Sequence, residues 1–234
     1  NLFDATFYVM SSTFNVYKVL DNNGNAASTV EPTGTSTSIL TTGDGYKWKY
    51  MYTLSASQQS NFLSTDFMAV ETNSTVSSAA VDGAIDIIRI KTPGSGGADG
   101  THTNIDIRGD GSGGKCSVTV AGGVVTAVTV TTAGTGYTFG TVSNAQIVAA
   151  GATSLSGAEL DVIIPPKGGH GKDAVKELGG FFVMLNKSLV GIEGTSDIGV
   201  SNDFRRIGLI RNPTNFGTST VASADTRRQL FAAI

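Results

Sequence analysis

The chain has 234 residues, of which 40% are hydrophobic and only 15% are charged, and it contains 30 glycines. This composition favours β-strands joined by tight turns over long helices. The formal net charge is −3 and the basic residues do not cluster beyond pairs, so there is no electrostatic reason to expect a nucleic-acid partner. The longest strongly apolar run, Phe181–Leu185, is far shorter than the ~20 residues that span a bilayer, so we expect no membrane partner.

The single cysteine, Cys116, excludes an internal disulfide framework and any cysteine-based zinc site. It alternates with Val118 and Val120, so we expect it to act as a small core residue. The first residue is Asn1 rather than Met, and we expect the chain to be a segment of a longer product.

The first predicted elements are strands. Two β-rich runs, residues 7–10 and 15–20, are separated by a polar turn and predict a hairpin. The next strand, residues 46–52, alternates aromatic and other side chains. Strict alternation places one set on a single face, so we expect a shared buried face made of Tyr46, Trp48, Tyr50 and Tyr52.

Shorter elements follow this aromatic strand. Ser55 and Gln58 have the spacing of a capping box, which predicts a short helix that ends near Leu63. A strand is expected over residues 67–70. The small polar residues of 72–80 are typical of a linker.

The middle of the chain repeats itself at an offset of 40 residues. The run that begins at Asp86 aligns with the run that begins at Thr126, and the register holds as far as Ile107 and Ile147. A fixed period indicates a repeated supersecondary unit, and the Gly-Gly pair at 122–123 predicts a hairpin inside it. Two repeats are too few for a free-standing solenoid, so we predict a small β module inserted between two halves of another domain.

The last third of the chain returns to strands and short helices. The predicted elements are a strand over 160–164, a helix over 172–178 that ends at Gly179, the buried strand Phe181–Leu185, a loop over 192–203, a strand over 204–211 and a terminal helix over 223–234. The predicted fold is therefore all-β, mainly an antiparallel β-sandwich with short helices. Residues 1–80 and 161–234 form the two parts of the sandwich core, and residues 81–160 form the inserted glycine-rich repeat module.

Two glycine- or asparagine-rich motifs come close to known ligand loops. Residues 109–116 nearly match a phosphate-binding loop, but Cys116 stands where a Ser or Thr would hold magnesium, and a strand rather than a helix follows. Residues 21–25 resemble the start of a calcium loop, but Ala26 replaces the required glycine and Pro32 the glutamate. Both segments are therefore predicted to be turns.

The histidines and acids offer no catalytic arrangement. Asp173 is too close in sequence to orient His170, so we interpret His170 as an anchor of the loop before the helix. His102 has no histidine partner at metal-ligand spacing. Asp44 and Glu177 are candidates for a carboxylate pair, but no sequence feature sets their separation, and Asp44 is more simply part of a turn. The sequence thus predicts no catalytic, cofactor-binding or metal-binding residue, and we do not expect an enzyme.

Three motifs stand in a fixed order along the chain. Residues 15–20 read Asn-Val-Tyr-Lys-Val-Leu, residues 43–50 read Gly-Asp-Gly-Tyr-Lys-Trp-Lys-Tyr, and residues 204–213 read Phe-Arg-Arg-Ile-Gly-Leu-Ile-Arg-Asn-Pro. They resemble, in the same order, strands of the dimeric baseplate wedge subunit of T4-like contractile-tailed phages. Residues 168–180 and the glycine-rich module are similar to versions from phages of cyanobacteria. The resemblance covers roughly residues 3–70 and 162–213.

This resemblance implies a β-sandwich core, no catalysis and a place in the virion, in a tail baseplate that is assembled in the host cytoplasm. It also implies contacts with other baseplate wedge proteins and self-association as a homodimer, and it transfers no ligand-binding residue. We therefore expect a structural component that scaffolds contacts between wedge subunits.

Two other classes of function stay open at this point. One is a tail adhesion module whose threonine-rich repeat surface, with Tyr137 at a turn, binds a host surface glycan. The other is a polysaccharide-degrading tail enzyme, which would need a cleft with two carboxylates at catalytic separation.

Overall fold

The computed structural model describes residues 7–185 and 205–217. The chain is mostly β, and its named strands pair in several small antiparallel sheets, so the predicted all-β class is confirmed. The predicted loop over 192–203 and terminal helix over 223–234 lie outside the described residues. The elements are β1 (Tyr8–Met10), β2 (Asn15–Asp21), η1 (Asn23–Asn25), β3 (Leu40–Thr41), β4 (Lys47–Thr53), α1 (Ala56–Phe62), β5 (Phe67–Ala69), α2 (Ser74–Ala79), β6 (Ile87–Ser95), β7 (Gly100–Asp106), β8 (Arg108–Gly109), β9 (Lys115–Ala121), β10 (Val124–Thr132), β11 (Gly140–Thr141), α3 (Asn144–Ala149), β12 (Ser156–Ile163), α4 (Ala174–Glu177), β13 (Phe181–Leu185) and β14 (Arg205–Arg211).

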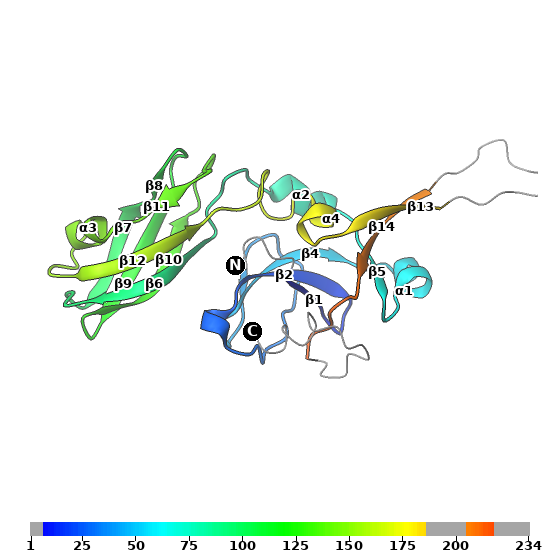
Figure 1. Ribbon diagram of the computed structural model, residues 1–234, viewed down its shortest axis with the longest axis horizontal. Coiled ribbons are helices and arrows are strands. Elements are labelled where there is room, and N and C mark those ends of the chain that lie inside the picture. The colour runs from blue at the N-terminus through cyan, green and yellow to red at the C-terminus, as the bar shows by residue number, and fades with distance from the viewer. Residues whose placement is uncertain (1–6, 186–204, 218–234) are drawn as a thin grey trace, which may run out of the picture.

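Two bodies lie side by side in Figure 1. The elements β6 to β12 form one body, which we call the module. The elements β1 to β5, α1, α2, α4, β13 and β14 form the other, which we call the core. The chain passes from one body to the other beside α2 and α4 (Figure 1).

Segments from before and after the module meet in the core. Leu209 on β14 pairs with Ala69 on β5. The backbone amide of Met10 donates to the carbonyl of Thr214 at 2.8 Å, and the amide of Phe216 donates to the carbonyl of Met10 at 2.9 Å. These contacts join regions that are far apart in the sequence into one body.

A β-bulge in β4 changes which face its aromatic residues occupy. Tyr17 on β2 pairs with Tyr50, whereas Val16 pairs with Tyr52, so Met51 is an extra residue on β4. Tyr46, Trp48 and Tyr50 stay together in one cluster, as expected. The prediction was wrong for Tyr52, which packs with Met51 in a different cluster because the bulge shifts the alternation.

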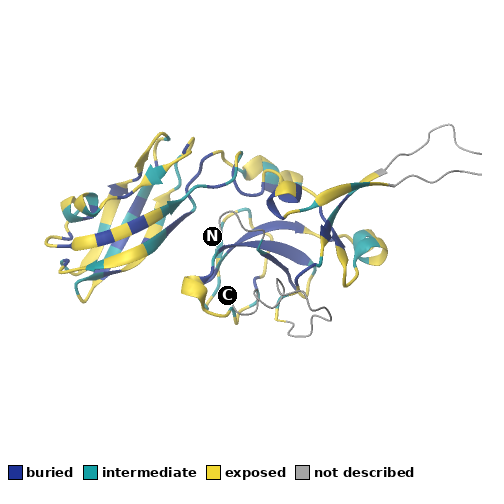
Figure 2. Cartoon of the chain, viewed as in Figure 1, coloured by how far each residue is buried: buried dark blue, intermediate teal, exposed yellow. Residues whose placement is uncertain are grey.

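In the four-stranded sheet β1-β2-β4-β3, the strands β1, β2 and β4 are buried on both faces (Figure 2). One face packs with α4 and with the three-stranded sheet β13-β14-β5, and the cluster between them includes Met51, Met68 and Ile210. The other face carries the remaining aromatic residues. The loop after β2 lies over this second face, where the hydroxyl of Tyr17 donates to the carbonyl of Gly34 at 2.6 Å.

The short helices of the core follow their capping residues. Ser55 and Gln58 form the predicted capping box at the start of α1. The predicted linker over 72–80 is wrong, because it contains the helix α2. The side chain of Asn73 accepts a hydrogen bond from the amide of Val76, and Val76 is buried, so a polar cap and one apolar contact order this segment.

The two repeat copies share their glycine turns but diverge afterwards. Gly94 and Gly96 have φ angles of 69° and 75°, and their equivalents Gly134 and Gly136 have 67° and 74°. The first copy then continues as β7, whereas the second forms β11 and α3, which begins at a capping box on Ser143. The ends of both copies still reach the same apolar core of the module.

Candidate functional site

The near match to a phosphate-binding loop is part of the module's packing. The strand β9 follows it, as expected. Gly109, Gly111 and Gly114 lie against the ring of Tyr137, and a Cβ atom on Gly111 would sit 2.4 Å from that ring. The Tyr137 hydroxyl donates to the carbonyl of Ile107 at 2.9 Å and accepts from the amide of Gly114 at 3.1 Å. Tyr137 is therefore buried, and the expectation that it is displayed at a turn is wrong.

The other candidate residues hold local structure. Asp44 accepts hydrogen bonds from the Ser28 hydroxyl at 2.7 Å and the Thr29 amide at 2.8 Å. Burial alone would raise the pKa of Asp44, but the hydrogen bonds from Thr42 and Ser28 hold it well below its usual value. Nε2 of His102 lies 3.0 Å from the carbonyl oxygen of Ala98. Within residues 7–185 and 205–217, no group of three or more His, Cys, Asp or Glu side chains is placed to hold a metal ion.

His170 and Glu177 meet at the boundary between core and module. Nδ1 of His170 lies 2.5 Å from Oε1 of Glu177, so His170 does anchor the loop before α4. Asp173 does not orient the ring and instead caps α4, where it accepts from the amide of Lys176 at 3.1 Å. Nζ of Lys18 lies 3.2 Å from the same oxygen of Glu177. No sequence pattern indicated this ion pair, because it depends on strand register and on a contact between distant segments.

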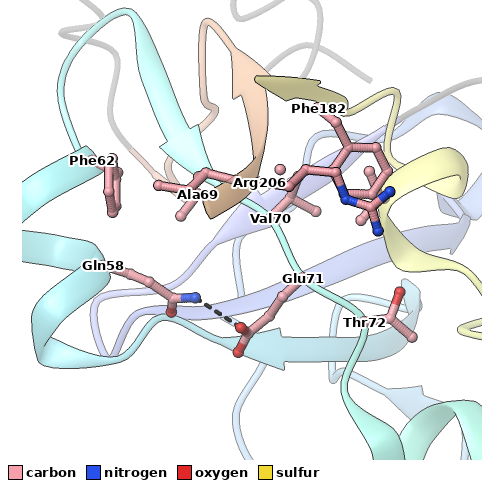
Figure 3. Close-up of a pocket in the computed structure, with 11 residues that line it drawn as sticks. Gln58, Phe62, Ala69, Val70, Glu71, Thr72, Phe182 and Arg206 are labelled. Carbon is pink, nitrogen blue, oxygen red and sulfur yellow. Dashed lines mark hydrogen bonds between the residues drawn. The ribbon is translucent and has the colours of Figure 1, made fainter. Parts of the chain in front are cut away.

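A hollow of about 370 Å³ opens beside the sheet β13-β14-β5 (Figure 3). Gln58 on α1 donates to Oε2 of Glu71 at 2.9 Å on one side. The guanidinium of Arg206 lies 4.1 Å from the ring centroid of Phe182 on the other side. This distance is within the range of a cation–π contact, and Phe182 stays about half exposed.

The strand β13 was predicted to be buried, and this prediction is wrong. Phe181 is 41% exposed, Phe182 is 51% exposed and Met184 is 69% exposed. β13 is an edge strand, since the order of its sheet is β13-β14-β5. It projects with β14 from the end of the core, and Figure 2 shows much of this hairpin as exposed. We call β13 and β14 the apolar arm.

We found no match to this chain among protein-family models, curated proteins or solved structures. Among the described residues, no helix has the length and apolar character needed to cross a membrane. In the part of the chain that the structure describes, the apolar arm has the strongest physical signature of a functional site, because an unpaired strand edge and exposed aromatic side chains coincide there.

Proposed function

We propose that the chain is a structural subunit of a phage tail baseplate wedge, which scaffolds contacts between wedge subunits and associates with itself. The exposure of Phe181, Phe182 and Met184 on an edge strand carries this proposal. Proteins usually protect such edges with charged residues or proline, and β13 has neither. A surface of this kind fits a subunit whose neighbour covers the arm in an assembly.

The positions of the three resemblance motifs support the same proposal. Two of them form β2 and β4, which are neighbours in one sheet. The third forms β14, in the sheet that packs on the same apolar cluster. The proposal accordingly places the chain in the virion, among other baseplate wedge proteins. The glycan-binding alternative loses one of its supports, because Tyr137 is buried.

The exposed side chains of the apolar arm allow the strength of self-association to be estimated. Covering its three exposed side chains is worth on the order of 4 kcal/mol per copy, from about 1.5–3 kcal/mol for a fully buried side chain. Two copies together gain about twice that, which is comparable with the ~4–15 kcal/mol that association costs in lost freedom. We therefore expect a dimer that depends on concentration rather than a permanent one.

The substitution Met184→Glu tests the arm as the contact surface. Met184 lies opposite Arg206 on β14, so a glutamate is tolerated in the separate subunit but places a charge inside the contact. We expect the dissociation constant to rise by roughly tenfold or more, measured by sedimentation velocity over a wide range of concentration.

Phe139→Glu is the matched control, because Phe139 is an exposed aromatic residue of the module, 58% exposed. It should leave self-association unchanged. A wild-type chain that stays monomeric at every concentration would contradict the proposal, as would equal effects of Met184→Glu and Phe139→Glu.

A further inference from the structure

Two buried lysines face each other on the core sheet. Lys18 on β2 and Lys49 on β4 are direct cross-strand partners, and they are only 3% and 6% exposed. Like charges directly opposite each other destabilise a sheet, and burying each charge carries a further desolvation cost. The pair therefore needs compensating acids.

The acids lie beside the two segments that connect the core to the module. Glu177 lies on α4, after the module, and its Oε1 is 3.2 Å from Nζ of Lys18. Its other oxygen accepts from the amide of Gly171 at 2.7 Å. Asp86 lies immediately before β6 and interacts electrostatically with Lys49 and His170. The Lys49 ammonium also donates to the carbonyl of Thr37, a contact within the core.

The charges of these groups respond to one another. Burial raises the pKa of Asp86, and the charges of His170 and Lys49 offset this only in part. Burial alone would raise the pKa of Glu177, but His170 and Lys18 hold it below its usual value. Burial lowers the pKa of Lys49, against the attraction of Asp86 and Glu177. Two lysines, one histidine and two carboxylates thus interact in one cluster, in which Lys18, Lys49, His170 and Glu177 are buried and Asp86 is half-buried.

The same connecting segments are fastened to the module. Oδ1 of Asp82 accepts from the amide of Gly168 at 2.5 Å, which ties the outgoing segment to the returning one. The carbonyl of Asp82 accepts from the amide of Gly136 at 2.8 Å, and the carbonyl of Gly83 accepts from the amide of Tyr137 at 3.2 Å. The cluster therefore acts on the module through a short, hydrogen-bonded connection.

We propose that these five side chains, Lys18, Lys49, Asp86, His170 and Glu177, form an electrostatic latch that fixes the orientation of the module on the core. The ionised Glu177 closes the latch. When Glu177 is neutralised, Asp86 is the only acid left in the latch, and opening of the connecting segments relieves the excess positive charge by admitting water. This device goes beyond the proposed function and holds whether or not the chain belongs to a phage tail.

Substitution tests the latch better than acid does, because its two carboxylates respond to pH in opposite senses. The lowered pKa of Glu177 gives stability that is present above its usual pKa and is lost as the pH falls through its folded value. The raised pKa of Asp86 gives stability that is present at low pH and is lost as the pH rises through its folded value.

The test uses the full chain with spin labels on cysteines that replace two exposed residues, Ser60 on α1 and Thr129 on β10. Cys116 does not compete for the label, because it is buried and burial raises its pKa to about 11. The labelled chain should give one narrow distribution of distances between the labels. The labelled chain that also carries Glu177→Gln should give a broadened distribution. We also expect amide exchange in residues 81–86 and 168–172 to accelerate roughly a hundredfold in Glu177→Gln.

The double variant Lys18→Met with Glu177→Gln separates charge from packing. It removes one lysine with one acid, so the narrow distribution should return. Glu159→Gln is the matched control, because Glu159 pairs with Lys91 at 3.0 Å in an ion pair whose side chains are more than half exposed. Glu159→Gln should change neither the distribution of label distances nor the rate of amide exchange.

Either of two results would overturn the latch. One is a narrow distribution with unchanged exchange in Glu177→Gln. The other is a double variant as broad as the single one. If Glu177→Gln does not fold, Asp86→Asn replaces it, and Asp86→Asn with Lys49→Met replaces the double variant. The latch is then overturned if Asp86→Asn keeps a narrow distribution with unchanged exchange, or if its double variant is as broad as the single one.

Discussion

Replacing Tyr52 with alanine is expected to lower the free energy of unfolding of the core by about 3–5 kcal/mol. Tyr52 is fully buried in the cluster between the two core sheets. Its hydroxyl donates to the carbonyl of Ala69 on β5 at 2.8 Å, so the ring and the hydroxyl both link one sheet to the other. The alanine variant leaves a cavity at this contact and a carbonyl without that donor.

Urea unfolding followed by the fluorescence of Trp48 measures this loss, because Trp48 is the only tryptophan and lies in the core. Tyr52→Phe keeps the ring and should cost about 1–2 kcal/mol for the hydrogen bond. Phe139→Ala, on an exposed side chain of the module, should stay within ~0.5 kcal/mol. If Tyr52→Ala cost no more than Phe139→Ala, the two sheets would not share the packed cluster described here.

The second large effect is expected at Gly83, where the connecting segment touches the module. Its φ angle is 63°, and a Cβ atom would lie 2.2 Å from the backbone nitrogen of Tyr137. Gly83→Ala therefore adds a clash with the backbone to the cost of positive φ. We expect a loss of ~3 kcal/mol or more in the stability of the module.

Gly122→Ala is a close control for the cost of a positive φ angle. Gly122 has the same φ angle of 63°, but nothing lies within 4 Å of its added Cβ atom. It should cost only the strain of positive φ, about 1–2 kcal/mol. Modification of the buried thiol of Cys116 in increasing urea reports unfolding of the module, since this cysteine lies in its core. Equal losses in the two variants would show that the φ angle alone, and not the close approach to Tyr137, makes alanine unfavourable at Gly83.

Local sequence patterns predicted most individual strands, but they did not predict how the strands pair or which of them are covered. The alternation of aromatic residues located β4, yet the bulge at Met51 arises only when β4 pairs with β2. The apolar run Phe181–Leu185 was correctly assigned as a strand. Its exposure was missed because the sequence records apolar character and not whether another layer covers the strand.

The buried charge cluster also could not be predicted from local sequence patterns. An anchoring role for His170 could be inferred from its place between glycines before a helix. Its partner Glu177 was considered only for a carboxylate pair with Asp44, and the structure places it beside His170 instead. Lys18 and Lys49 gave no signal at all, because lysines on strands are ordinarily exposed and only the register brings these two together.

Electron cryomicroscopy of contractile tail particles that contain this chain tests the proposed function most directly. The proposal predicts density for the chain in the baseplate, with Phe182 and Met184 covered by a neighbouring subunit. Particles whose baseplates lack the chain, or in which both side chains face solvent, would contradict it.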